Sequence, residues 1–184
     1  VLQGRLQSGS LVKNEDEQPY LPVLNAVFRE DIRFLAAHPQ YLLQALPGTA
    51  LEAISPLYQT RPLASTGPDY LNAVAVLQTA LGPQELLGAL HAIEAQCDRQ
   101  RPYLNAPRTL DLDLLCHGTA VRHSSTLTVP HPRLTGRAFV LEPLMAVWST
   151  LAADPFAPLP DVPCAADRVR LVQDQGVVRL SETL

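Results

Sequence analysis

The sequence predicts an α+β domain in which helices pack on a largely antiparallel sheet. Segments with helical or strand-like spacing follow the order helix, strand, strand, helix, strand, helix and hairpin, without β-α-β alternation or an internal repeat. The 184 residues are 47% apolar and 17% charged, a composition typical of a globular chain long enough to bury a core. We expect a single domain over residues 31–184, preceded by an N-terminal segment, residues 1–30, whose fold the sequence leaves open.

Apolar spacing and turn residues place each element in order. Pro39 interrupts the first helical segment, and Pro83 suits the first turn of the second helix, where its missing N–H costs little. The final hairpin is predicted from Asp174-Gln175-Gly176, a turn sequence between two apolar runs. The predicted elements are a helix over 29–46, strands over 51–58 and 70–79, a helix from 82 to about 95, a strand over 108–115, a short strand over 119–123, a helix from about 136 to 152, and a hairpin over 169–180.

The charge and cysteine content exclude several classes of protein. The formal net charge is −4, so no overall positive field would recruit nucleic acid. No apolar run approaches the roughly 18 residues that span a bilayer, and the first residues lack the apolar core of a signal peptide. The three cysteines include no C-x-x-C pair, which favours reduced thiols. We therefore expect a cytoplasmic protein without a membrane or nucleic-acid partner.

The stretch R-T-L-D-L-D-L-L at residues 108–115 alternates aspartate with leucine. In a strand, Asp111 and Asp113 would lie on one face, about 6.6 Å apart along the strand, while the leucines point into the core. Aspartate is depleted in strands, so the alternation has two explanations: a half-buried strand with a solvated face, or a metal site. Two carboxylates on one rigid face suit Mg²⁺, which takes its other ligands from water and phosphate oxygens, and do not suit Zn²⁺.

Arginine gathers around this acidic strand. Of the 14 basic residues only Lys13 is a lysine, and six arginines fall within 39 residues, at positions 99, 101, 108, 122, 133 and 137. Guanidinium groups bind phosphate in a bidentate manner, although a general compositional preference for arginine would give the same count. Two acids beside a cluster of arginines are what phosphoryl transfer needs. No G-x-x-x-x-G-K-[ST] or G-x-G-x-x-G motif is present, so these glycine-rich phosphate loops are excluded.

His131 follows Val129-Pro130 in a polar stretch that also carries Arg133 and Arg137. It is either a surface or structural histidine, or a donor to a phosphate oxygen. A Ser-His-Asp hydrolase is not indicated, because no serine lies in a G-x-S-x-G context.

Five motifs occur in order between residues 47 and 150: S-P-L-Y-Q-T-R-P-L, G-P-D-Y-L-N-A-V, A-I-E-A-Q-C-D-R-Q-R, N-A-P-R-T-L-D-L-D-L-L and L-T-V-P-H-P-R-L-T-G-R-A-F-V-L-E-P-L. Together they resemble the 6-hydroxymethyl-7,8-dihydropterin pyrophosphokinase family of folate synthesis. The resemblance implies a ferredoxin-like α+β sandwich. It also implies transfer of pyrophosphate from ATP to the hydroxymethyl group of the pterin, with release of AMP.

The resemblance further implies roles for individual residues. Asp111 and Asp113 would hold two Mg²⁺ ions that bridge the phosphates of ATP, the co-substrate. The catalytic arginines would be Arg99, Arg101 and Arg108; the ATP site would include Glu94, Leu127, His131 and Arg137; and the pterin site would include Thr60, Arg61, Leu63, Tyr70, Asn72 and Phe139. The partners would be the two small-molecule substrates, and the protein is expected to be a monomer.

The N-terminus departs from the family pattern. Members open with a strand that ends in Gly-Ser-Asn or Gly-Ala-Asn, whose asparagine reaches the substrate. Here only Gly9-Ser10-Leu11 is found, and Asn25 is a poor candidate for that asparagine. The alternative to an active enzyme is therefore a degenerate member that binds pterin or nucleotide without turnover.

Overall fold

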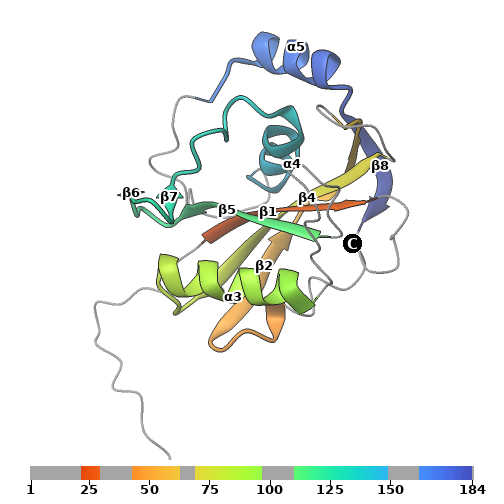
Figure 1. The fold of residues 1–184 in the computed structure, drawn as a ribbon. Coiled ribbons are helices and arrows are strands. Elements are labelled where there is room, and N and C mark those ends of the chain that lie inside the picture. Colours follow the sequence, from red (N-terminus) through yellow and green to blue (C-terminus); the bar gives the residue numbers. More distant parts are fainter. Residues whose placement is uncertain (1–21, 30–42, 63–68, 97–109, 149–161, 184) are drawn as a thin grey trace, which may run out of the picture.

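The computed structural model describes residues 22–29, 43–62, 69–96, 110–148 and 162–183. Figure 1 shows the elements in place. In chain order they are β1 (Pro22–Arg29), β2 (Thr49–Ile54), β3 (Pro56–Thr60), β4 (Tyr70–Thr79), α3 (Pro83–Gln96), β5 (Leu110–His117), β6 (Arg122–His123), β7 (Thr128–Val129), α4 (Ala138–Trp148), α5 (Ala165–Gln175) and β8 (Val178–Thr183).

The main sheet is antiparallel, with the strand order β5-β1-β4-β3-β8, and β2 also pairs with β4. β2 and β3 lie end to end along β4, β2 against its second half and β3 against its first. Ser55 separates them: its hydroxyl accepts the Val74 N–H at 3.0 Å, and its own N–H donates to the Val74 carbonyl at 2.9 Å. The single strand predicted over 51–58 is therefore two strands, because Ser55 bonds to β4 through its side chain as well as its backbone.

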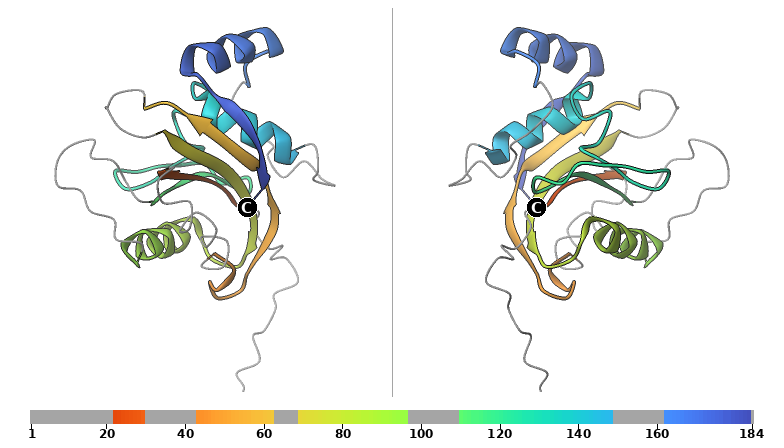
Figure 2. Two further views of the ribbon diagram at one scale, coloured as in Figure 1. Left: turned by 90° about the vertical axis from the view of Figure 1, so that its right-hand side faces the viewer. Right: turned by 90° about the vertical axis from the view of Figure 1, so that its left-hand side faces the viewer.

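Helices cover both faces of the sheet. α3 packs on one face, α4 packs on the other, and α5 lies beyond α4 (Figures 1 and 2). The α3 side is closed by leucines and isoleucine of the helix against leucines of β5: Leu86, Leu90, Ile93, Leu110, Leu112 and Leu114. The α4 side is closed by Val140, Leu141 and Leu144 against Val23, Val74 and Val76. The predicted fold class, an α+β sandwich with an antiparallel sheet, is confirmed.

The central strand β1 comes from the N-terminal segment whose fold the sequence leaves open. It pairs with β4 along one edge and with β5 along the other. Its sequence, P-V-L-N-A-V-F-R, is buried over residues 22–26 and holds no Gly-x-Asn. The sheet therefore has a complete centre without the family's opening motif.

The hairpin predicted at the C-terminus is wrong: residues 165–175 form the helix α5. Gly176 ends it with φ 62° and ψ 41°, and the N–H groups of Gly176 and Val177 bond back to the carbonyls of Gln173 (3.3 Å) and Val172 (3.1 Å). A left-handed glycine serves a hairpin turn and a helix end equally well, so the turn sequence does not distinguish them. The half-buried positions 168, 171, 172 and 175 have the spacing of one helix face.

Most other element predictions are confirmed where the structure describes them, but the strand predicted over 119–123 is reduced to the two residues of β6. β4 spans the predicted 70–79, β5 covers the acidic strand, and α3 and α4 lie within the predicted helices. The stretch after His123 that was expected to be loop includes the short strand β7, which pairs with β6. The helix predicted over 29–46 is wrong at its start, because Arg29 belongs to β1, and of its last four residues only Leu43 and Gln44 are helical; residues 30–42 lie outside the described residues. Among the described helices, none is long and apolar enough to cross a bilayer.

Candidate functional site

Polar side chains cross the α4 side of the sheet from β5 to β4. The strand register pairs Asn25 of β1 with Asp113 of β5, and pairs Val27 with both Asp111 and Asn72. Residues directly opposite each other in an antiparallel sheet lie on the same face. The two acids and the two asparagines therefore share one face, next to the valines that α4 covers.

Asp111 and Asp113 lie on β5 as the alternation predicts. Both are half-buried, while the leucines beside them are buried on the opposite side, against α3. Arg137 approaches from the loop before α4, and its Nη1 lies 3.5 Å from Oδ2 of Asp113. The two side chains are 20% and 28% exposed, so the contact is partly shielded from water but open to a ligand.

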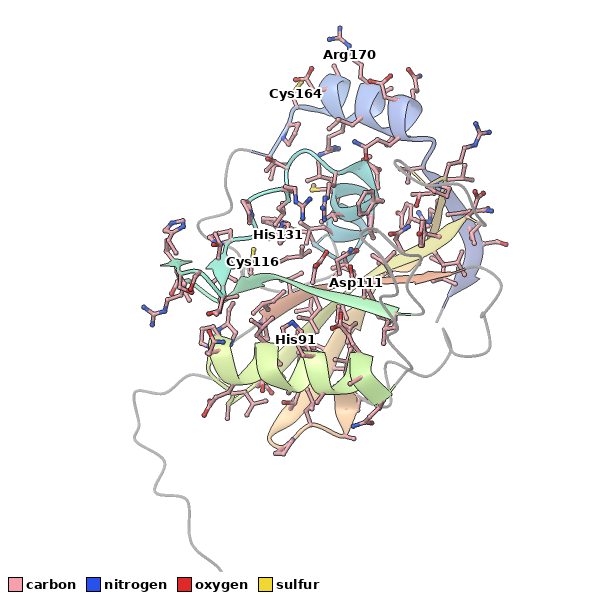
Figure 3. The ribbon with its side chains drawn as sticks, viewed as in Figure 1. His91, Asp111, Cys116, His131, Cys164 and Arg170 are labelled. Atoms are coloured by element: carbon pink, nitrogen blue, oxygen red, sulfur yellow. The ribbon has the colours of Figure 1, made fainter. Side chains whose placement is uncertain are left out.

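The backbone of His131 is anchored to the edge of β5. Its N–H donates to the Leu115 carbonyl at 2.8 Å. Figure 3 shows His131 and Asp111 on the α4 side of β5, whereas His91 lies with α3 on the other side. The histidine loop is therefore held over the strand that carries the two acids.

The ring of His131 accepts a hydrogen bond through Nδ1. Its Nδ1 accepts the Arg133 N–H at 3.1 Å, which assigns the proton of the neutral ring to Nε2. Burial lowers the pKa of His131; Asp113 opposes this effect, and Arg137 adds to it. In the neutral ring, Nε2–H is the group that can donate to an anionic or carbonyl oxygen.

Arg137 and Phe139 stand side by side at the start of α4. The guanidinium carbon lies 5.5 Å from the centroid of the Phe139 ring, which is within cation–π range. Phe139 is half-buried and packs against the apolar clusters on the α4 side. An aromatic ring and a cation are thereby held together beside Asp113.

Asn72 of β4 is almost fully buried, at 1% exposure. Its Nδ2 donates to the Thr60 hydroxyl at 3.0 Å and to the Tyr58 carbonyl at 3.3 Å. Its Oδ1 has no donor within the described residues. A buried acceptor left unpaired costs free energy, so this oxygen suits a ligand that brings an N–H group.

Two further residues of the predicted pterin site lie near Asn72 and Thr60. Tyr70 lies opposite Thr60 in the β3–β4 register and is half-buried. Arg61 follows β3 and is exposed. The structure therefore brings Thr60, Tyr70 and Asn72 together at one end of the sheet.

Asn25 has a position in the structure that the sequence alone does not reveal. It is fully buried beside Asp113, and within the described residues neither its Nδ2 nor its Oδ1 has a hydrogen-bond partner. The signal that could have found it was a single amide inside the apolar run V-L-N-A-V. That signal has meaning only once residues 22–29 are known to be a central strand.

Glu94 supports the acidic strand from the other side. It is 1% exposed at the end of α3, and its Oε1 accepts the N–H of Leu112 at 2.9 Å. Leu112 lies between the two aspartates, so Glu94 fixes the backbone that carries them. The contact therefore ties the end of α3 to the acidic strand.

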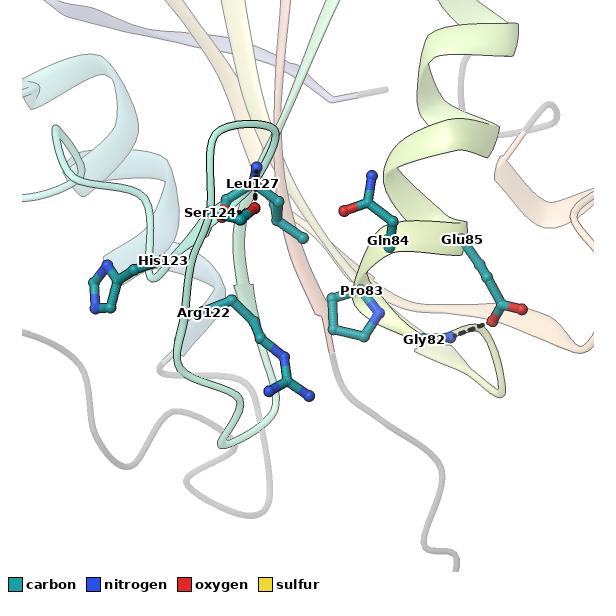
Figure 4. A pocket seen from close by; sticks show the side chains of 8 residues that line it. All are labelled: Gly82, Pro83, Gln84, Glu85, Arg122, His123, Ser124 and Leu127. Carbon is teal, nitrogen blue, oxygen red and sulfur yellow. Dashed lines mark hydrogen bonds between the residues drawn. The ribbon is translucent and has the colours of Figure 1, made fainter.

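Leu127 lies apart from His131 and Arg137. It is 8% exposed, belongs to the apolar cluster on the α3 side, and lines a pocket of about 370 Å³ (Figure 4). The start of α3 forms one wall of this pocket and the β6–β7 hairpin the other; the lining residues are Gly82, Pro83, Gln84, Glu85, Arg122, His123, Ser124 and Leu127. The predicted ATP-site residues are thus divided between the two sides of the edge strand β5.

Four predicted site residues, Arg99, Arg101, Arg108 and Leu63, lie outside the described residues. Their roles stay predictions.

The acid pair fits Mg²⁺ by the chemistry of its donors. Asp111 and Asp113 offer carboxylate oxygens on one face of a rigid strand. In the described part of the chain, no group of three His, Cys, Asp or Glu side chains could hold a metal ion. A hard cation that keeps water or phosphate oxygens as its other ligands suits such a pair.

Comparisons with known proteins identify the family. A family profile described as 7,8-dihydro-6-hydroxymethylpterin-pyrophosphokinase (HPPK) matches residues 30–149. A protein of Pseudomonas aeruginosa named 2-amino-4-hydroxy-6-hydroxymethyldihydropteridine pyrophosphokinase is 45% identical over 116 residues, which are 59% of this chain and 72% of that protein. A Haemophilus influenzae protein of the same name is 34% identical over 140 residues, 76% of this chain and 84% of that protein. A Synechocystis protein of that name is 40% identical, and the match spans 57% of this chain and 54% of that protein. The family's reaction is the transfer of pyrophosphate from ATP to hydroxymethyldihydropterin in folate synthesis, and the acid pair, Arg137, Phe139 and Asn72 gather on one face of the sheet. These matches show that the chain belongs to the 7,8-dihydro-6-hydroxymethylpterin-pyrophosphokinase family.

Proposed function

We propose that this chain carries out that transfer on the α4 side of β5, with Asp111 and Asp113 as its Mg²⁺ platform. The observation that carries the proposal is the single face that holds the acid pair, the Arg137–Phe139 pair and the buried Asn72. The acid pair and Arg137 offer charge for phosphates, and the Phe139 ring beside them and the amide of Asn72 offer contacts for a flat heterocycle. Nothing in the described residues favours the alternative of a degenerate member.

The two carboxylates would hold Mg²⁺, and two ions are expected. Bound Mg²⁺ would neutralise the negative charge that moves between phosphate oxygens during the transfer. Glu94 keeps the strand segment between the carboxylates in place through the Leu112 N–H. The chain's own contribution is therefore a rigid pair of oxygen ligands rather than a closed metal cage.

Arg137 and His131 would act on the phosphates of ATP. The guanidinium lies beside Asp113, and the backbone of His131 is bonded to the same strand, with Nδ1 of the ring taken up by the Arg133 N–H. Both groups can donate to phosphate oxygens, Arg137 with a full positive charge. Arg99, Arg101 and Arg108 are proposed to complete this positive set on the strength of the family resemblance alone.

Asn72, Phe139 and Tyr70 would hold the pterin. The Oδ1 of Asn72 can accept an N–H from the ring edge, and the Phe139 ring offers an apolar face for stacking. The pterin hydroxyl oxygen then attacks the β-phosphorus of ATP in line. Its O–P bond forms as the bond to the α-phosphate oxygen breaks, AMP leaves, and the hydroxyl proton is released.

The test is AMP release with and without the pterin. The chain should release AMP from ATP only when Mg²⁺ and 6-hydroxymethyl-7,8-dihydropterin are both present. Asp111→Asn and Asp113→Asn should each abolish most of this activity, whereas Asp174→Asn, at an exposed position of α5, should leave it unchanged. Calorimetric binding of a non-hydrolysable ATP analogue without any AMP release would refute the proposal and favour the degenerate alternative.

The number of Mg²⁺ ions, the monomeric state, the cytoplasmic location and the absence of a nucleic-acid partner stay predictions from the sequence. Mg²⁺ titration of the nucleotide complex tests the number of Mg²⁺ ions. Equilibrium sedimentation tests the monomeric state.

A further inference from the structure

The side chain of Gln175, the last residue of α5, makes two hydrogen bonds to the loop that carries Arg137. Its Oε1 accepts the Ala138 N–H at 2.9 Å, and its Nε2 donates to the Gly136 carbonyl at 3.0 Å. Gly136 and Ala138 are the immediate chain neighbours of Arg137. One amide therefore holds the peptide groups on both sides of the arginine.

The backbone of Gln175 is itself held firmly. Gly176 closes the helix in the left-handed conformation, and Val177, the next residue, is buried against Tyr58 and Ala138. β8 then pairs with β3 in the main sheet. The amide is thus presented from a fixed corner between α5 and the sheet, so its two hydrogen bonds constrain the loop rather than follow it.

Arg137 needs such a partner because it occupies the N-cap position of α4. Its carbonyl accepts the N–H groups of Val140 (3.0 Å) and Leu141 (2.9 Å). An N-cap residue commonly uses its own side-chain oxygen to accept an N–H of the first turn, but a guanidinium has no acceptor. Gln175 supplies an acceptor from another helix. The arginine side chain is left to contact Asp113 and the Phe139 ring.

We propose that Gln175 is a positioning residue of the active site: its amide clamps the peptide groups around Arg137 and thereby directs the guanidinium toward Asp113 and the phosphates of ATP. Gln175 lies outside residues 30–149, the region that the family profile matches, so the family match assigns it no role. The inference rests on the proposed role of Arg137. It makes the C-terminal helix, which lies beyond α4, part of the catalytic machinery.

The direct test follows the Arg137 side chain by ¹⁵N NMR. The Nε–H signal of Arg137, assigned by its disappearance in Arg137→Lys, should shift or broaden in Gln175→Leu, which removes both hydrogen bonds. It should stay in place in Gln173→Leu, an exposed position on the same helix. Gln175→Glu keeps an acceptor for Ala138 and loses the donor to Gly136, so it should also move the signal if Gln175→Leu folds poorly. An unchanged signal in both Gln175 variants would overturn the proposal.

The kinetic test asks whether Gln175 acts through Arg137. A small displacement of a positioned charge lowers turnover strongly, so Gln175→Leu should reduce kcat by about tenfold or more. In an Arg137→Ala background the same change should cost less than about twofold, because residues that act through one another are not additive. An equal loss in both backgrounds would indicate a purely structural role and refute the clamp. If the unsubstituted chain releases no AMP, the proposed function fails, but the NMR test still decides the clamp.

Discussion

Replacing Asn25 by valine should stabilise the fold. Asn25 is fully buried on β1, and neither amide atom has a hydrogen-bond partner within the described residues. A buried polar group left unpaired costs about 1–3 kcal/mol, which an apolar side chain of similar size avoids. Val23 and Val27 lie on the same face two residues away on either side, so a β-branched side chain suits this strand.

The expected magnitude is a gain of about 1–3 kcal/mol in the free energy of unfolding. For a domain of this size that corresponds to a rise in Tm of about 2–4 °C per kcal/mol. Urea denaturation at neutral pH measures it as a higher midpoint with an unchanged slope.

Asn72→Val is the matched control. It lies on the neighbouring strand and the same face, but its Nδ2 makes two hydrogen bonds, to Thr60 and to the Tyr58 carbonyl. Its loss should destabilise the chain by about 1–3 kcal/mol, since buried partners are left unpaired. The two valine variants should therefore move the urea midpoint in opposite directions.

A lower midpoint for Asn25→Val would refute the reasoning. It would mean that the amide is satisfied in solution, by an ordered water or by rotation toward Asp113. If the midpoint rises and AMP release falls, Asn25 is a residue kept for function at a cost in stability.

Three further predictions concern two residues of β5 and the side chain of Glu94 that contacts this strand. Asp113→Asn should weaken the Mg²⁺-dependent binding of a non-hydrolysable ATP analogue at least about tenfold. Removing groups that only orient metal ligands already lowers metal affinity roughly 10–100-fold. Unchanged affinity in calorimetry would contradict the role of the acid pair as a metal platform. Glu94→Leu should lower the free energy of unfolding by about 1–3 kcal/mol because it removes the buried acceptor of the Leu112 N–H. Glu94→Gln keeps an acceptor and should cost less, so equal urea midpoints for the two variants would argue against this bond. Burial lowers the pKa of His117 below its usual 6.5, so the unfolded chain binds a proton that the folded chain does not, and the fold loses stability as the pH falls below about 6.5. His117→Gln keeps a donor for the Leu81 carbonyl and should reduce the dependence of the unfolding free energy on pH by up to about 1.4 kcal/mol per pH unit. An unchanged pH dependence would exclude His117 as its source.

The acidic strand shows how far a local pattern reaches. The alternation of aspartate and leucine predicts both the strand and its two faces, because side chains alternate whatever the strand packs against. The strand over 70–79 and the helix after Gly82 follow in the same way from apolar spacing and a proline at the first turn. These features need only neighbours within a few residues, and the structure confirms them.

The C-terminal helix and the central strand could not be predicted in this way. Gly176 ends a helix or makes a turn with one backbone conformation, and the choice depends on Leu171 and Val172 packing against the α4 side. Asn25 is an ordinary amide in an apolar run until β1 is placed between β4 and β5, opposite Asp113.

The sequence by itself therefore determined the acid pair, its strand and the family. Only the tertiary structure decided what surrounds the pair: Arg137 beside Asp113, Asn25 buried without partners, and Gln175 reaching across from α5. The physical reason is that side-chain periodicity is a property of a short segment. Hydrogen bonds and burial at the site join residues far apart in the chain, and these contacts are set only when the sheet and helices pack together.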